Sequence, residues 1–164
     1  MIAIGLVGSA WLAYAATGPS GNAYPIQAAK VKAKGELAAP ACTVAVKPKC
    51  SKFSASVKRS ATGANAGVNK GSFSLKDANT KTTYKFKVIT DMQCTNQAFA
   101  QLTGTGTASG AANVGNTYGS IAQITETSAT TGSLVIAIVQ TPSNAIKFTY
   151  SGPLNKAKFN LDCP

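Results

Sequence analysis

The sequence predicts an all-β domain, a β-sandwich of Greek-key type, from three observations. Apolar and polar side chains alternate over much of the chain after Lys30, which is the period of a strand with one buried face. Turn-forming Gly, Asn, Ser and Pro residues separate these runs. No stretch after residue 30 has the 3.6-residue period of an amphipathic helix. Roughly eight or nine short strands at this spacing favour a sandwich.

Strands are expected where the alternation is clear. They lie at 30–34, 42–46, 72–75, 83–90, 133–140, 145–151 and 157–162. The run at 133–140 is apolar on both faces, which is typical of a central buried strand. Asp77 and Asn79 predict a hairpin loop at 76–81, and a Gly-, Ala- and Asn-rich composition predicts a loop or weak edge segment at 103–116. Pro142 and Pro153 are expected to end strands.

The chain divides into three parts. The first 29 residues carry no charged side chain. Their apolar run of about 15 residues is shorter than the ~20 that span a bilayer, and it ends at the small-x-small triplet Ala13-Tyr14-Ala15. Residues 1–15 are therefore predicted to be a secretory signal peptide, with an apolar anchor or a segment buried in a neighbouring subunit as alternatives. Residues 16–29 form an extension, and 30–164 the β-sandwich domain.

The four cysteines predict disulfides rather than a metal site. The chain has no histidine and no C-x-x-C motif, and a zinc site made of cysteines usually needs two close pairs. An even number behind a signal peptide predicts two disulfides, with three possible connectivities, in a secreted extracellular protein. We favour Cys42–Cys94, which joins the start of one strand to the end of another. Cys50–Cys163 then ties the last strand to the beginning of the fold.

Enzymatic activity and a cofactor are not expected. The absence of histidine removes Ser-His-Asp, Cys-His and His-metal sites together. The five acidic residues are scattered along the sequence. Asp91 and Glu126 could meet as a glycosidase pair, but neither has an aromatic-rich context.

The charge predicts attraction to polyanions. The net charge is +11, and thirteen of the 16 basic residues lie between Lys30 and Lys87. Part of this charge has a structural cause, because outward lysines keep a sheet face hydrated. Arg59 is the only arginine, so specific nucleic-acid recognition is not expected. The lysines expected to bind an anionic surface polymer are Lys30, Lys32, Lys34, Lys85 and Lys87.

Two stretches resemble the subunits of chaperone–usher fimbriae. KVKAKGELAAPACTV (30–44) is similar to the first strand of these pilins, and YKFKVITDMQCTNQAFAQLTGTGTA (84–108) to the strand that ends at their second cysteine and the strand after it. The resemblance implies an incomplete immunoglobulin-like sandwich with a Cys42–Cys94 disulfide. A neighbour's N-terminal extension would complete it, with Tyr24, Ile26 and Ala28 facing inward.

Two functions follow from these observations. The first is a secreted structural subunit of a cell-surface filament, assembled by strand complementation between identical copies with the help of an assembly chaperone. The alternative is a monomeric secreted module that binds polyanions through a lysine-rich face.

Overall fold

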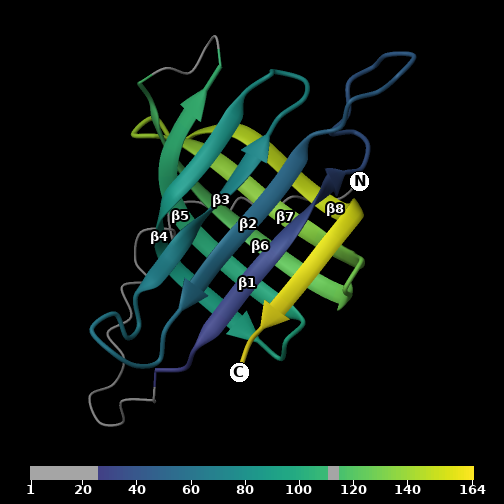
Figure 1. Ribbon diagram of the computed structural model, residues 1–164. Coiled ribbons are helices and arrows are strands. Elements are labelled where there is room, and N and C mark those ends of the chain that lie inside the picture. Colours follow the sequence, from purple (N-terminus) through teal and green to yellow (C-terminus); the bar gives the residue numbers. More distant parts are fainter. Residues whose placement is uncertain (1–25, 111–114) are drawn as a thin grey trace, which may run out of the picture.

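The described residues, 26–110 and 115–164 of the computed structural model, form a closed barrel of eight antiparallel strands (Figure 1). Each strand pairs with its neighbours in the sequence, and β8 pairs with β1. The strands are β1 (Ala29–Leu37), β2 (Lys52–Arg59), β3 (Asn69–Lys76), β4 (Thr83–Thr95), β5 (Phe99–Ser109), β6 (Thr117–Ser128), β7 (Thr131–Thr141) and β8 (Ala145–Asp162). The all-β prediction is confirmed, and the predicted sandwich, immunoglobulin-like or Greek-key, is wrong.

Two long strands close the barrel. The first half of β8 pairs with β7 and the second half with β1. Similarly, β4 pairs with β5 along most of its length but with β3 only from Thr83 to Phe86. Each of these strands therefore belongs to both layers of the barrel, one formed by β1 to β3 and the other by β5 to β7. In Figure 1, β1 to β3 at the front cross β5 to β7 behind them, as in orthogonal sheet packing.

The interior of the barrel is filled by apolar side chains. They come from alternate positions of the strands, because successive side chains of a strand point to opposite faces. Phe73 stacks on Phe86 with 4.6 Å between ring centroids, and Tyr84 meets Tyr118 edge to face at 5.3 Å. The largest fully buried side chains are Tyr118, Phe53, Phe73, Phe86, Leu37, Leu75, Met92, Leu102, Ile124, Leu134, Ile136 and Ile138.

Three element predictions need correction. Residues 42–46 belong to the hairpin between β1 and β2 and not to a strand of the barrel. The stretch at 103–116, predicted to be a loop or weak edge segment, belongs up to Ser109 to β5, which lies between β4 and β6. Its glycines let β4 approach closely: a Cβ on Gly104 would lie 2.9 Å from the Val88 carbonyl oxygen. Pro153 does not end β8. It pairs with β7 immediately before Leu154 pairs with β1, so the strand changes partner there.

The hairpin loop predicted at 76–81 is confirmed. β3 ends at Lys76 and β4 begins at Thr83. The buried carboxylate of Asp77 accepts hydrogen bonds from the Asn79 backbone N–H at 3.0 Å and from the Thr80 hydroxyl at 2.6 Å. This is the local side-chain-to-backbone bonding that makes Asp a turn residue.

All four cysteines form disulfides, as predicted, but the predicted pairing is wrong. Cys42 bonds to Cys50, and Cys94 bonds to Cys163. Cys42 and Cys50 face each other across the antiparallel hairpin between β1 and β2. Cys94 lies at the end of β4, and Cys163 follows β8, whose last residues pair with the start of β1. The pairing Cys42–Cys94 would have had to join opposite ends of the barrel, because β1 and β4 run in opposite directions.

The predicted signal segment, residues 1–15, lies outside the described residues, as does most of the extension. In the part of the chain that is described, no helix has the length and apolar character needed to cross a membrane.

Candidate anion-binding surface

The outer surface of the second half of β8, of β1, β2 and β3, and of the start of β4 is rich in lysine. The local cause is the alternation of each strand: in β2, Phe53 and Val57 point inward, so Ser54, Ser56 and Lys58 point outward. We call this surface the basic face. Its lysines are Lys30, Lys32, Lys34, Lys52, Lys58, Lys70, Lys76, Lys85, Lys156 and Lys158.

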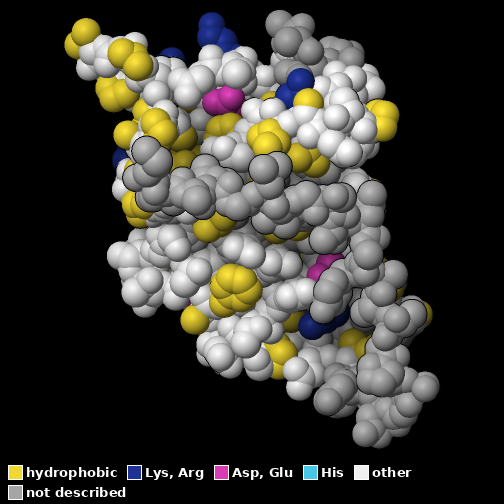
Figure 2. Space-filling view, turned by 180° about the vertical axis from the view of Figure 1, so that it is seen from behind, with side chains coloured by type: hydrophobic (Ala, Val, Ile, Leu, Met, Phe, Trp, Pro, Cys, Tyr) yellow, Lys and Arg dark blue, Asp and Glu magenta, His cyan; other side chains and the backbone are white. Residues whose placement is uncertain are grey.

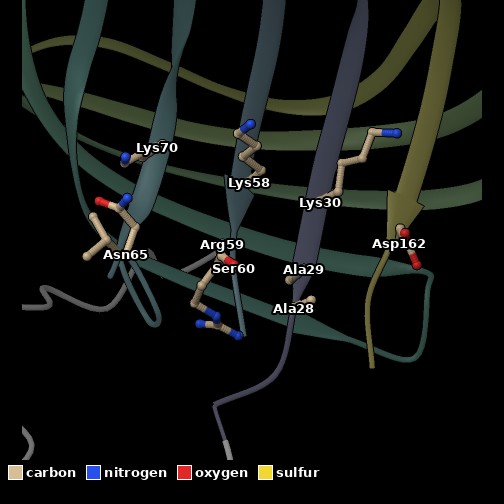
Figure 3. A pocket seen from close by; sticks show the side chains of 10 residues that line it. Ala28, Ala29, Lys30, Lys58, Arg59, Ser60, Asn65, Lys70 and Asp162 are labelled. Carbon is tan, nitrogen blue, oxygen red and sulfur yellow. The ribbon is translucent and has the colours of Figure 1, made fainter. Parts of the chain in front are cut away.

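Three lysines form a row across three neighbouring strands, which we call the lysine row. Lys30 on β1 lies opposite Lys58 on β2, which lies opposite Lys70 on β3 (Figure 3). Neighbouring strands are about 4.8 Å apart, and like charges that face each other across strands are destabilising. Asp162 is opposite Lys30 at one end of the row, but it forms no ion pair in the described chain. The row therefore holds three positive charges against the single carboxylate of Asp162.

The lysine row borders a shallow pocket at one end of the barrel. Asn65 and Ser60 add polar groups to its lining. Arg59 also lines it, and its guanidinium donates hydrogen bonds to the carbonyl oxygens of Gln27 at 3.1 Å and Met92 at 3.0 Å. Arg59 thus stabilises the wall of the pocket, while the three positive charges of the lysine row and the negative charge of Asp162 make up its other charged groups.

Serines lie between the lysines on the rest of the basic face. One row across the strands runs Lys158, Lys34, Ser54, Ser74, Lys85. The row between it and the lysine row runs Asn160, Lys32, Ser56, Ser72. Hydroxyl groups can donate and accept hydrogen bonds. The face therefore combines ammonium groups with small neutral hydrogen-bonding side chains.

Glu36 neutralises part of the charge at the other end of the face. Its carboxylate lies 3.0 Å from Lys156 Nζ and 3.2 Å from Lys52 Nζ. Hydrogen bonds from these lysines, first Lys156 and then Lys52, lower the pKa of Glu36 below its ordinary value. Over residues 26–110 and 115–164 these are the only ion pairs. The centre of the face and the lysine row remain available to an external anion.

The opposite side of the barrel is different in charge. Strands β5, β6 and β7 contain no lysine or arginine. The view from behind shows mostly uncharged and apolar side chains, with a few basic groups among them (Figure 2). The positive charge is therefore concentrated on one side of the molecule.

Four of the five predicted anion-binding lysines lie in the rows of the basic face. Lys30, Lys32 and Lys34 are on β1, and Lys85 is at the β4 margin. Lys87 lies at a register shift between Phe86 and Val88, outside these rows. Sequence reasoning missed Lys58, Lys70 and Lys158. The alternation in KFSASVKR (52–59) and in NKGSFSLK (69–76) was the signal that could have identified the first two.

The residues proposed for strand donation are only partly described. Ile26 and Ala28 run directly into β1 of their own chain, and Tyr24 lies outside the described residues. The Ile26 side chain lies over Gly67 in the loop between β2 and β3. Ala28 lines the pocket beside the lysine row.

The acidic residues do not gather into a cluster. Asp91 on β4 accepts a hydrogen bond from the Gln93 side chain, and Glu126 on β6 accepts one from the Leu161 backbone N–H. β5 lies between these two strands. Among residues 26–110 and 115–164, no group of three or more potential metal ligands occurs.

The chain was compared with family models, with curated proteins and with solved structures. None of the three comparisons gives a significant match.

Proposed function

We propose that the protein binds an acidic polysaccharide through the basic face. The observation that carries this proposal is the lysine row, in which Lys30, Lys58 and Lys70 face one another without a carboxylate bonded to any of them. Such an arrangement lowers the stability of the sheet. A polyanion would relieve the repulsion, because it brings several negative charges to adjacent lysines at once.

The chemistry of the face favours a polysaccharide over a nucleic acid. The outward positions of β1, β2 and β3 carry no aromatic side chain on which bases could stack. Lysine supplies charge without the bidentate geometry that arginine offers to phosphates and guanine. The serines between the lysines suit the hydroxyl groups of a sugar polymer. Two disulfides are compatible with an extracellular location, where such polymers occur.

Binding to heparin, used as a sulfated test polymer, measures this function. The triple variant Lys30→Ser, Lys58→Ser, Lys70→Ser should bind at least about tenfold more weakly at moderate salt, with a slope of log affinity against log salt smaller by about 2. The matched control is Lys81→Ser, Lys87→Ser, Lys147→Ser. Both triple variants lower the net charge from +11 to +8. The control should therefore retain most of the affinity if position matters.

Two results would contradict the proposal. Equal losses in the two triple variants would mean that only net charge matters. Tighter binding to single-stranded or duplex DNA than to heparin, at equal salt and with the same loss in the lysine-row variant, would assign the face to nucleic acid instead.

Assembly into a filament stays a prediction. In the described chain each strand has two neighbours in the closed sheet, so no strand is missing from it, although β3 and β4 pair only from Thr83 to Phe86. Electron microscopy of concentrated full-length protein, beside a variant that lacks residues 16–25, tests for it. Filaments that form only with the intact N-terminus would support assembly, and monomers in both samples would exclude it.

A further inference from the structure

The loop between β1 and β2 is a projecting hairpin closed by a disulfide. Figure 1 shows it extending away from the barrel above β1 and β2. Cys42 bonds to Cys50 at its base. Beyond the disulfide, the Thr43 backbone N–H donates to the Lys49 carbonyl oxygen at 2.9 Å. The Lys49 N–H in turn donates to the Thr43 hydroxyl oxygen at 2.9 Å. The hairpin is thus a defined element and not an open loop.

The base of the hairpin is held to the barrel by hydrogen bonds. The Ser51 N–H donates to the Ala41 carbonyl oxygen, and the Ser51 carbonyl oxygen accepts from the Leu37 N–H, both at 2.8 Å. The Ser51 hydroxyl donates to the Asp77 carboxylate at 3.3 Å. The Ala38 N–H donates to the Tyr150 hydroxyl oxygen at 2.9 Å. The hairpin therefore has a fixed position relative to the barrel.

The tip of the hairpin carries two fully exposed apolar side chains. Val44 and Val46 have relative exposures of 106% and 101%, whereas the next most exposed large apolar side chain, Ile146, has 70%. Single exposed apolar residues are common, but two fully exposed valines at the end of a cross-linked hairpin form a small apolar patch. Because the side chains are open on every side, they suit a fluid environment that surrounds them better than a groove that contacts one face.

The charge around the tip favours an anionic environment. Lys47 and Lys49 follow the valines, and the chain has no acidic residue from Leu37 to Lys76. The nearby carboxylates of Glu36 and Asp77 are already bonded within the barrel. Apolar side chains followed at once by lysines match the boundary of a bilayer, where acyl chains lie below anionic headgroups. Lysine stems can lie along the apolar layer while their ammonium groups contact phosphate.

We propose that the hairpin inserts its tip into the surface of an anionic lipid bilayer. Val44 and Val46 enter the boundary between headgroups and acyl chains, and Lys47 and Lys49 bind the lipid phosphates. The disulfide keeps the valines at the tip, so that the hairpin does not have to be ordered on binding. This site is separate from the lysine row and does not depend on polysaccharide binding.

A tryptophan at the tip reports insertion directly. In the full-length Val46→Trp variant, vesicles of equal parts phosphatidylglycerol and phosphatidylcholine should shift the tryptophan emission to the blue. Brominated lipid should then quench it. Trp11, the only native tryptophan, contributes a background emission, which is measured on the unsubstituted protein. The matched control is Val135→Trp on β7, which should add no quenched component.

Vesicle flotation measures the contribution of each group. The variant Val44→Ser, Val46→Ser should bind these vesicles at least about tenfold more weakly. The control variant Val88→Ser, Val135→Ser makes the same chemical change at exposed positions of β4 and β7 and should bind like the unsubstituted protein. Replacing Lys47 and Lys49 by Ser should weaken binding about thirtyfold at low salt, and less at high salt.

The proposal is wrong if the tip tryptophan is neither shifted nor quenched, or if both valine variants bind alike. Selective binding of the tip to an acidic protein, with no response to vesicles, would also overturn it. Heparin binding of Val44→Ser, Val46→Ser should equal that of the unsubstituted protein. That measurement keeps a failure of membrane insertion distinct from a failure of the polysaccharide proposal.

Discussion

Asp77 joins two loops at one end of the barrel. Its buried carboxylate accepts hydrogen bonds from Ser51 in the hairpin and from Asn79 and Thr80 in its own turn. The Ser51 hydroxyl oxygen also accepts from the Ala78 N–H at 3.0 Å. A single acidic side chain thus fixes the position of the hairpin relative to the turn between β3 and β4.

Replacing Asp77 should therefore lower the free energy of unfolding. In Asp77→Ala the turn N–H and the two hydroxyls lose their acceptor, and buried polar groups without partners cost about 1–3 kcal/mol. Urea unfolding followed by circular dichroism measures the loss. Asp91→Ala, at an exposed carboxylate on β4, is the control and should change the value by less than about 0.5 kcal/mol. Equal effects of both variants would mean that the Asp77 bonds contribute little.

Tyr84 makes the stability of the barrel sensitive to alkaline pH. Its pKa is raised above the ordinary value of 10.0, first by burial and then by Tyr118 and Asp77. The folded-state pKa is higher than the unfolded-state pKa. The contribution of neutral Tyr84 to the free energy of unfolding is therefore complete below pH 10 and is lost as the pH rises through the folded-state pKa. Tyr84→Phe should therefore lose less stability than the unsubstituted protein above pH 10. Thermal unfolding from pH 8 to 11 tests this, and parallel curves for both proteins would contradict it.

The two disulfides stabilise different kinds of element. Cys42–Cys50 closes a loop within one hairpin, with a sequence separation of 8, whereas Cys94–Cys163 ties the end of β4 to the end of β8, with a separation of 69. Restriction of the unfolded chain grows with the length of the loop that is closed. The second disulfide should therefore contribute more to the stability of the barrel.

Cysteine-to-alanine pairs measure this difference. Removing Cys94 and Cys163 should lower the free energy of unfolding by about 4 kcal/mol, and removing Cys42 and Cys50 by about 2.5 kcal/mol. Each variant serves as the control for the other, because each removes one covalent bond. A larger loss from the Cys42–Cys50 pair would mean that the hairpin stabilises the barrel through contacts and not through chain restriction.

At the scale of elements, the sequence predicted some strands and missed others. Alternation located β4 and the two ends of β8, because apolar residues at every second position require one buried face. No strand was predicted at β2 or β6, and the prediction also failed at β5, where glycines and threonines gave a loop-like composition. Gly104 and Gly106 are needed there because the β4 backbone lies too close for a Cβ. Only the packing of β4 against β5 reveals that requirement.

The charge of the whole molecule should reduce its stability at low salt. The net charge is +11, and the lysine row adds local repulsion to it. Lys58→Thr removes the middle charge of that row and should raise the free energy of unfolding by about 0.5 kcal/mol at low salt. The gain should shrink at high salt. The same substitution should weaken heparin binding. Urea unfolding at two salt concentrations measures the gain in the free energy of unfolding and its dependence on salt.

Lys147→Thr is the matched control for this prediction, because Lys147 is exposed on β8 outside the basic face. It should leave stability within about 0.3 kcal/mol of the unsubstituted protein. If Lys58→Thr destabilises the barrel, or if both variants gain equally, the lysine row is not a site of concentrated repulsion.

The anion-binding surface was predictable in kind but not in extent. The composition predicted attraction to polyanions, and the alternation of KVKAK (30–34) placed lysines outward on one strand. Which lysines become neighbours depends on register. Lys30, Lys58 and Lys70 lie far apart in the sequence and meet only because β1, β2 and β3 pair in this alignment.

The sequence by itself determined that the protein is built from strands, that its lysines lie outward and that its cysteines form disulfides. These properties are local, because each depends on residue types and on a period of two. The tertiary structure decided between sandwich and barrel, since β4 and β8 each pair with both layers. It also decided the partners of Cys42 and Cys94, the lysine row and the exposed valines of the hairpin. The partner of Cys94 and the lysine row depend on pairing between distant segments, which composition and periodicity do not specify. The partner of Cys42 and the exposure of the valines depend on β1 ending at Leu37, so that residues 42–46 lie in a hairpin and not in a strand.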